Sequence, residues 1–212
     1  MDCRAFYALD GAAGAANVSS LGCTISGMSD TAPLTGEPLA LDLVNTHPST
    51  GDQLATPRDL LAWWTLEADR LSGEVPREVD DEDLAAVLAV REHIARVLDQ
   101  VRHGKRPLAD GLAALNEAQR AAPAVSELAW DGSALAVTRR REGSPGVRLA
   151  AELAEAAAGL LADPAVGKIR KCEADDCVLL FLPTNPRRRW CSASGCGNRA
   201  RVARHYQRHK RD

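Results

Sequence analysis

Residues 172–196 read CEADDCVLLFLPTNPRRRWCSASGC and contain four of the six cysteines in this 212-residue chain. The four cysteines form two pairs, Cys172-x4-Cys177 and Cys191-x4-Cys196, and thirteen residues separate the pairs. Paired cysteines on tight turns suit Zn²⁺, which takes four soft ligands in a tetrahedron. We therefore predict that these four cysteines bind one zinc ion per chain.

Two other uses of these cysteines stay open. Disulfides would need an oxidising compartment, and the N-terminal stretch lacks the continuous apolar region of a secretory signal. A mixed site with His205 and His209 would need a longer gap, because eight residues separate Cys196 from His205 and about twelve are usual in two-histidine fingers. We expect both histidines on the surface of a basic helix, and Cys3 and Cys23 to be incidental thiols.

The charge of the chain is divided unevenly. Residues 167–212 hold 12 Lys+Arg and 4 Asp+Glu, a net of +8, whereas residues 1–166 hold 14 basic and 25 acidic residues, a net of -11, and the two sum to -3. Such asymmetry indicates a nucleic-acid-binding end. The alternative is a basic tail that is solvated or folds back on the acidic part.

A basic helix is expected after the last cysteine. Gly197 suits a positive φ beside the metal, and Asn198 suits the N-cap of a helix that starts at Arg199. At about 100° per residue, the side chains on one face are Arg201, Arg204, Arg208 and Arg211. Val202 and Tyr206 fall on a neighbouring stripe, where we expect them to pack on the knuckles, the two cysteine-bearing turns.

Basic side chains before Cys191 and along this helix are the expected nucleic-acid contacts. They are Arg187, Arg188, Arg189, Arg199, Arg201, Arg204, Arg208, Lys210 and Arg211. Arg201 and Arg204 follow the metal most closely and are expected to read bases, while Arg208 and Arg211 contact phosphates. Burial of Trp190 on the finger is favoured over stacking on a base.

Short motifs in this segment resemble those of a known family. They are RKC at 170–172, LFL at 180–182, RWCS at 189–192 and CGNRA at 196–200. Together they resemble the CGNR-type zinc finger, and LDLVNT at 41–46 resembles the signature of the ABATE domain that usually precedes it. The resemblance covers residues 36–210 and implies a bacterial, stress-induced transcription regulator.

Upstream of the cysteines, the pattern predicts a mainly α (α+β) fold. Helices are expected over residues 56–71, 80–103, 108–120 and 147–161. A β-hairpin is expected over residues 128–138 around Asp131-Gly132, and residues 36–46 suit either a strand or a helical turn. Trp63 and Trp64 are expected to place one ring in the core and one on the surface.

The predicted domain organisation has three parts. Residues 1–35 are expected to be a disordered N-terminal extension, residues 36–166 a helical ABATE-like domain, and residues 167–212 the zinc finger. Within the helical domain, a polar cluster could line a small-molecule pocket: Asp42, Asn45, Thr46 and His47. The alternative is local capping, because Asn and Thr side chains often bond nearby backbone.

The function expected from the sequence is DNA-binding transcription regulation without catalysis. The chain has no Gly-x-Ser-x-Gly, phosphate-binding glycine loop or His-Glu-x-x-His. The expected partner is double-stranded DNA in the cytoplasm, and no membrane is expected, since no apolar run reaches about 18 residues. A homodimer and a small-molecule effector stay open, as do an RNA-binding module, a protein–protein adaptor with a structural finger, and an enzyme in the helical domain.

Overall fold

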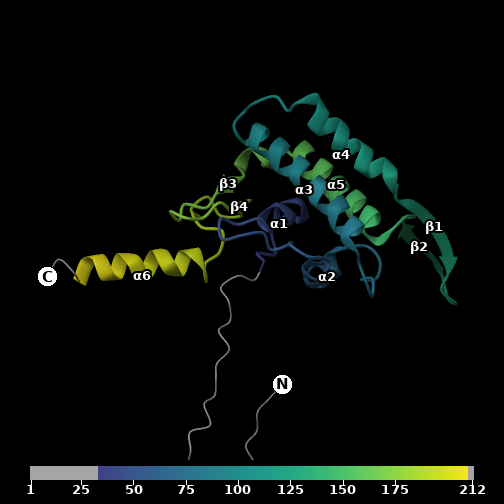
Figure 1. Ribbon diagram of the computed structural model, residues 1–212, viewed down its shortest axis with the longest axis horizontal. Coiled ribbons are helices and arrows are strands. Elements are labelled where there is room, and N and C mark those ends of the chain that lie inside the picture. The colour runs from purple at the N-terminus through teal and green to yellow at the C-terminus, as the bar shows by residue number, and fades with distance from the viewer. Residues whose placement is uncertain (1–32, 210–212) are drawn as a thin grey trace, which may run out of the picture.

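The computed structural model describes residues 33–209 (Figure 1). The predicted disordered extension therefore lies outside the described residues up to residue 32, as do Lys210 and Arg211. The fold is mainly α, as predicted. The helices are α1 (Leu39–Asn45), α2 (Pro57–Leu66), α3 (Asp81–Arg102), α4 (Ala109–Ala121), α5 (Pro145–Ala162) and α6 (Cys196–His209), with 3-10 turns at Ala68–Arg70 and Pro164–Lys168.

Helices α3, α4 and α5 pack together as the centre of a helical body (Figure 1). α3 begins at a capping box, because the Asp80 side chain accepts from the backbone N–H of Asp83 and the Asp83 side chain accepts from that of Asp80. Asp83 also accepts from the backbone N–H of Gly146 at 2.7 Å. A Cβ on Gly146 would lie 2.2 Å from the Asp83 Cα, so the close approach of α5 to α3 requires glycine.

The two N-terminal helices cover this centre. Residues 36–46, which suited either a strand or a helical turn, contain α1. Its residues Leu41 and Leu43 are fully buried. α2 starts as predicted, with Thr56 as N-cap and Pro57 at the first position. The expectation for the tryptophan pair is wrong, because Trp63 and Trp64 are both buried. Adjacent helical residues lie about 100° apart, and a core-facing helix buries an arc at least that wide.

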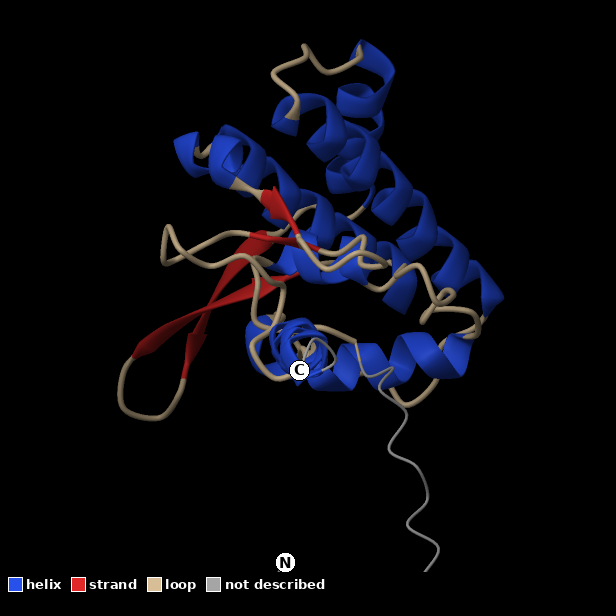
Figure 2. Cartoon of the chain, turned by 90° about the vertical axis from the view of Figure 1, so that its left-hand side faces the viewer, coloured by secondary structure: helices blue, strands red, loops and turns tan. Residues whose placement is uncertain are grey.

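The predicted hairpin is present and is longer than expected. β1 (Val125–Trp130) pairs antiparallel with β2 (Leu135–Arg140), with Leu128 opposite Val137 and Trp130 opposite Leu135. The Asp131 side chain accepts from the backbone N–H groups of Ser133 and Ala134, and Gly132 has a φ of 102°. The hairpin extends beyond the ends of the helices (Figure 2).

The C-terminal part begins after α5 and stands at the other end of the molecule from the hairpin (Figure 1). Its short strands β3 (Arg170–Lys171) and β4 (Leu180–Phe181) pair antiparallel, and β4 contacts α1. α6 then projects from this small sheet. Within the described residues, no helix has the length and apolar character that a membrane span requires.

Candidate zinc centre and nucleic-acid interface

The first cysteine pair lies on the turn between β3 and β4. Cys172 follows β3 directly, and its backbone N–H donates to the carbonyl of Leu179 at 2.9 Å. The backbone N–H of Cys177 donates to the carbonyl of Ala174 at 3.0 Å and closes the turn. These backbone bonds place both thiols on the same side of the strand pair, as a metal knuckle requires.

The second pair lies where a turn enters α6. The Ser192 hydroxyl accepts from the backbone N–H of Gly195 at 3.0 Å, and the Ser192 carbonyl accepts from that of Gly197 at 2.9 Å. The turn therefore continues directly into the helix, which begins at Cys196 rather than at Arg199. Consequently Asn198 is not the N-cap, and Gly197 does not take a positive φ.

Gly197 suits its position for a different reason than the one predicted. A Cβ at this position would lie 3.2 Å from the Ser192 carbonyl oxygen, closer than nine in ten real Cβ contacts. A larger residue here would have to displace the knuckle backbone by a few tenths of an ångström.

The four sulfur atoms fit a tetrahedral zinc ion. All four Sγ atoms lie within 4.8 Å of one another, with Cys177 and Cys191 3.9 Å apart and Cys191 and Cys196 3.6 Å apart. A tetrahedron with Zn–S bonds of about 2.3 Å has edges of about 3.8 Å. The same distances are far longer than a disulfide bond of about 2.05 Å. The chain thus carries a four-cysteine zinc site, consistent with one zinc per chain.

Neither histidine of α6 belongs to this group. His205 and His209 are exposed and stack on each other, with ring centroids 4.2 Å apart. Among the described residues, the four cysteines are the one group with metal-ligand geometry. The mixed Cys/His alternative therefore has no support.

The surroundings of the thiols explain why a cation is needed. Burial raises the pKa of Cys177 to about 11 and also raises that of Cys191. Burial acts in the same direction on Cys196, but a hydrogen bond from Arg199 Nη2 at 3.0 Å and bonds with the neighbouring thiols hold its pKa below the usual value. Bound Zn²⁺ would stabilise the deprotonated forms that it needs as ligands.

Arg188 makes structural contacts within the chain, and its predicted contact with nucleic acid stays a prediction. Its guanidinium lies 4.5 Å above the ring of Phe181, which is fully buried beneath the cysteines. Arg188 Nη2 pairs with Glu37 at 2.5 Å, and Nε donates to the Trp190 carbonyl at 3.0 Å. These contacts connect the arginine to the helical body and leave it little freedom to bind phosphate.

Two residues of the helical body bind the backbone of β4 and the residue after it. The Asn45 amide donates to the Leu180 carbonyl and accepts from the Leu180 N–H, both at 2.8 Å. Glu37 accepts from the backbone N–H of Leu182 at 2.8 Å. We call these contacts, with the Glu37–Arg188 ion pair, the junction. The junction fixes the zinc module, residues 168–209, against α1.

The other members of the predicted pocket cluster separate. Asp42 is fully buried, accepts from the backbone N–H groups of Gly36 and Glu37, and pairs with Arg70 at 2.6 Å. Burial raises its pKa to about 7. Thr46 is buried and donates to the Leu43 carbonyl at 2.6 Å, which is the capping alternative.

Asn45 and the exposed His47 do border a common space. They line an open groove of about 610 Å³ between α1, α3 and the zinc module, and Lys171 and Leu180 lie on its other side. Asp42 and Thr46 do not line this groove. The cluster therefore supplies two groove residues and two structural ones, and a ligand in the groove stays a prediction.

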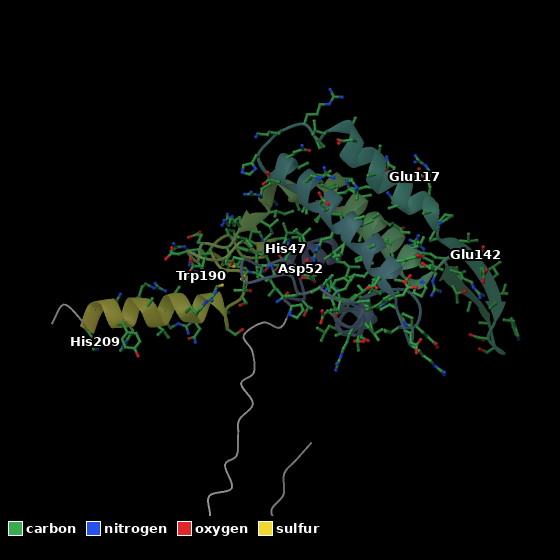
Figure 3. The ribbon with its side chains drawn as sticks, viewed as in Figure 1. His47, Asp52, Glu117, Glu142, Trp190 and His209 are labelled. Carbon is green, nitrogen blue, oxygen red and sulfur yellow. The ribbon has the colours of Figure 1, made fainter. Side chains whose placement is uncertain are left out.

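α6 leaves the knuckle after its first turn and has no cover. Residues 201–206, 208 and 209 are all exposed. Packing of Val202 and Tyr206 on the knuckles is therefore wrong, since they are 45% and 71% exposed. Figure 3 shows Trp190 near the start of the helix and His209 near its far end. The helix points away from the rest of the chain, so the apolar positions of α6 stay uncovered.

The remaining predicted contacts lie on the surface around Trp190 and α6. The guanidinium of Arg204 lies 5.8 Å from the half-buried Trp190 ring, and that of Arg189 lies 5.3 Å from the same ring. Arg189 also pairs with Glu173 at 2.5 Å. The other exposed arginines are Arg187, Arg199, Arg201 and Arg208. The structure therefore brings Arg189 and Arg204 to the same Trp190 ring and places Arg199, Arg201 and Arg208 along α6.

Two family models match the chain. One is the ABATE model, described as "Putative stress-induced transcription regulator", which matches residues 37–164. The other is the CGNR zinc finger, which matches residues 168–209. No curated protein matches the chain. The order of the two matches is the order of the helical body and the zinc module. The chain belongs to the ABATE family and carries a C-terminal CGNR zinc finger.

Proposed function

We propose that this chain regulates transcription by binding double-stranded DNA through its zinc module, with α6 as the contacting element. The observation that carries the proposal is the state of α6. It is a 14-residue helix held at its first residue by the zinc site, and its residues 201–206, 208 and 209 are exposed. Isolated helices of this length are marginal in water, so the metal supplies the rigid end from which it can grow.

The charge of α6 selects the partner. The helix contains Arg199, Arg201, Arg204 and Arg208 and no acidic residue. Apart from Val202, Ala203 and Tyr206, the residues described as exposed from position 201 onward are arginine or histidine, so α6 has only a short apolar stripe to place against a protein core. The major groove of B-DNA admits one α-helix and is flanked by phosphates. A basic helix of this kind therefore matches duplex DNA better than it matches another protein.

Different arginines are assigned different parts. Arg201 and Arg204 lie in the second and third turns, nearer the metal than Arg208, and they are the candidates for base contacts. Arg204 is further held by the Trp190 ring and by a bond from its Nε to the Ala200 carbonyl at 3.1 Å. Arg208 and Arg187 are candidates for phosphate contacts. Arg188 is assigned no contact with DNA, because its guanidinium pairs with Glu37.

The zinc ion has a structural part in this proposal, and the chain is proposed not to be an enzyme. Four cysteine ligands leave no open coordination position for a substrate or water. The helical body then supplies regulation, through an effector in the groove beside Asn45 and His47 or through a homodimer. RNA binding is the second candidate, but single-stranded RNA is recognised by stacking on aromatic side chains, and besides histidines the described surface of the zinc module offers the half-buried Trp190 and the exposed Tyr206.

The experiment is a salt titration of the full-length protein on duplex DNA. Each phosphate contact releases counterions, so log affinity should fall linearly with log salt by about 0.9 per contact. Arg208→Ala should reduce the slope by about one and weaken all sequences alike, while Arg204→Ala should cost about 1–3 kcal/mol on a selected site and relax its preference. The matched control is Arg120→Ala, an exposed arginine of α4, which should change neither value.

Two outcomes would contradict the proposal. Equal affinity for duplex DNA and single-stranded RNA of the same length, reduced by replacing Trp190, would favour the RNA candidate. Absence of salt-dependent affinity for either nucleic acid would leave the adaptor as the better explanation.

A further inference from the structure

The hairpin lies at the end of the molecule opposite to α6 (Figure 1), and it exposes large apolar side chains. Residues paired across antiparallel strands lie on the same face of the sheet, and alternate residues share that face. Two adjacent cross-strand pairs are therefore side by side on one face: Leu128 with Val137 and Trp130 with Leu135. They are 64–71% exposed, although they are four large apolar side chains.

This concentration of apolar side chains is specific to the hairpin. With Val125, the hairpin contributes five of the eleven exposed large hydrophobic residues in the described part of the chain, and the others are spread over several elements. Single exposed hydrophobic residues are ordinary, whereas a contiguous patch marks an interaction surface. A two-stranded hairpin is also marginally stable in water without cover on its hydrophobic face.

The hairpin is nevertheless held in a fixed position. Arg139 of β2 and Arg141 after it both pair with Glu155 of α5, the first at 2.7 Å. Arg141 also donates to the carbonyl of the fully buried Ala122, at the end of α4. These contacts tie the base of the hairpin to two helices and leave its distal half, which carries the apolar face, projecting. The face is therefore preorganised for a partner rather than collapsed onto the body.

We infer that the apolar hairpin face, formed by Leu128, Trp130, Leu135 and Val137, binds the same face of a second copy of this chain. A two-fold axis between two hairpins that run in opposite directions brings identical patches together, as in an isologous dimer. It also brings the tip of each hairpin to the base of the other. The tip carries the anionic Asp131, and the base carries Arg139 and Arg140, which already pair with Glu155 at 2.7 Å and Glu127 at 3.6 Å, so Asp131 of the second copy would join these ion pairs.

The area fits a second copy. The four side chains expose roughly 500 Å², at the upper end of patches on monomeric proteins. Two such faces give about 1,000 Å² of buried surface, which is the lower bound for a specific interface between folded chains. The expected dimer is thus concentration-dependent rather than permanent. It would hold the two α6 helices at its two far ends.

The inference names the dimer that the proposed function leaves open, but its test requires no DNA. Sedimentation velocity of the full-length protein is measured from about 1 to about 200 µM, a range in which a weak dimer changes its population. The wild type should shift from monomer to dimer across this range. Trp130→Glu should raise the dissociation constant at least about tenfold, since aromatic side chains in the centre of an interface carry most of its affinity.

Two further variants separate dimer loss from damage to the fold. The double variant Leu128→Glu with Val137→Lys removes the apolar face and creates a cross-strand ion pair that supports the hairpin, so it should stay folded and monomeric. The matched control is Leu66→Glu, since Leu66 is 59% exposed on α2 and should leave the dimer unchanged.

A wild type that stays monomeric at every concentration would overturn the inference and assign the face to a different protein partner. A dimer that persists in the double variant would place the interface elsewhere. Either result leaves the salt titration on DNA to decide the proposed function by itself.

Discussion

The helical body and the zinc module are folded by different forces. The body buries a continuous apolar cluster drawn from α1 to α5 and the segments between them, and Ile169 at the start of the module completes its 22 residues. The buried cluster of the module consists of Phe181 and the four cysteines. A module with so little apolar area cannot fold on hydrophobic burial alone. The two parts should therefore respond to different perturbations, and the junction between them should respond to both.

The largest effect is expected from removing the metal. Cys177→Ser, or a chelator added to the wild type, should unfold the zinc module, because zinc contributes about 10–16 kcal/mol of apparent binding free energy in small zinc-finger peptides. Zinc content should fall from one equivalent to none. The helical body should keep its helical circular dichroism signal, with loss limited to α6.

Collapse of the whole protein on chelation would contradict the comparison, because it would mean that the body also depends on the metal. Ser192→Ala is the control for the knuckle, since it removes a turn hydroxyl and no ligand. It should keep its zinc.

A cavity in the body should have the next largest effect. Leu153 lies on α5 and is fully buried in the apolar cluster. Leu153→Ala should lower the free energy of unfolding of the body by about 2–5 kcal/mol, measured by urea denaturation. Zinc content at low urea should be unchanged. Leu108→Ala, at a position 61% exposed, should change the free energy of unfolding by less than about 0.5 kcal/mol.

Breaking the junction should affect both parts by a smaller amount. Asn45→Ala removes two hydrogen bonds to the backbone of Leu180 and leaves both groups unpaired, at a cost of about 1–3 kcal/mol. Hydrogen exchange should then increase at residues 180–182 while zinc stays bound. Asn45→Asp keeps one acceptor and loses the donor, so it separates the two bonds. Asn116→Ala, at an exposed position of α4, should change neither the stability nor the hydrogen exchange of residues 180–182.

The smallest effect on stability distinguishes two arginines of the module. Arg204 is exposed on α6, so Arg204→Ala should change the free energy of unfolding by less than about 0.5 kcal/mol while weakening DNA binding. Arg188→Ala should do the reverse, with a stability loss of about 1–2 kcal/mol from its partly buried ion pair and its contact over Phe181. Equal stability losses for the two variants would remove the distinction.

Local signals in the sequence predicted the metal site and the starts of α2, α3 and α4. The cysteine spacing identified the four ligands, and Thr56-Pro57 and Asp80 marked the starts of α2 and α3, because capping acts over three or four residues. The hairpin followed from the Asp131-Gly132 pair in the same way. These features depend on neighbours in the chain, so neighbours in the chain reveal them.

Long-range partners left no such signal. Asn45 binds Leu180 across 135 residues, and Glu37 pairs with Arg188 across 151. Nothing in the local sequence around Asn45 or Arg188 indicated these partners. The same limit explains the error at Val202 and Tyr206. Their helical spacing predicted a packed stripe, but spacing cannot tell whether another part of the chain reaches that stripe.

The single attachment of α6 has a consequence for how members of this family can diverge. Residues 201–206, 208 and 209 are exposed on this helix, so most replacements there should be neutral for folding. A lineage can therefore change what this helix recognises by single substitutions without first acquiring compensating changes in the core. Residues 37, 45 and 188 cannot be replaced as freely, since they form the junction that fixes the zinc module, and α6 with it, against α1. We expect the exposed helix to vary among descendants of one ancestor while the parts that present it stay the same.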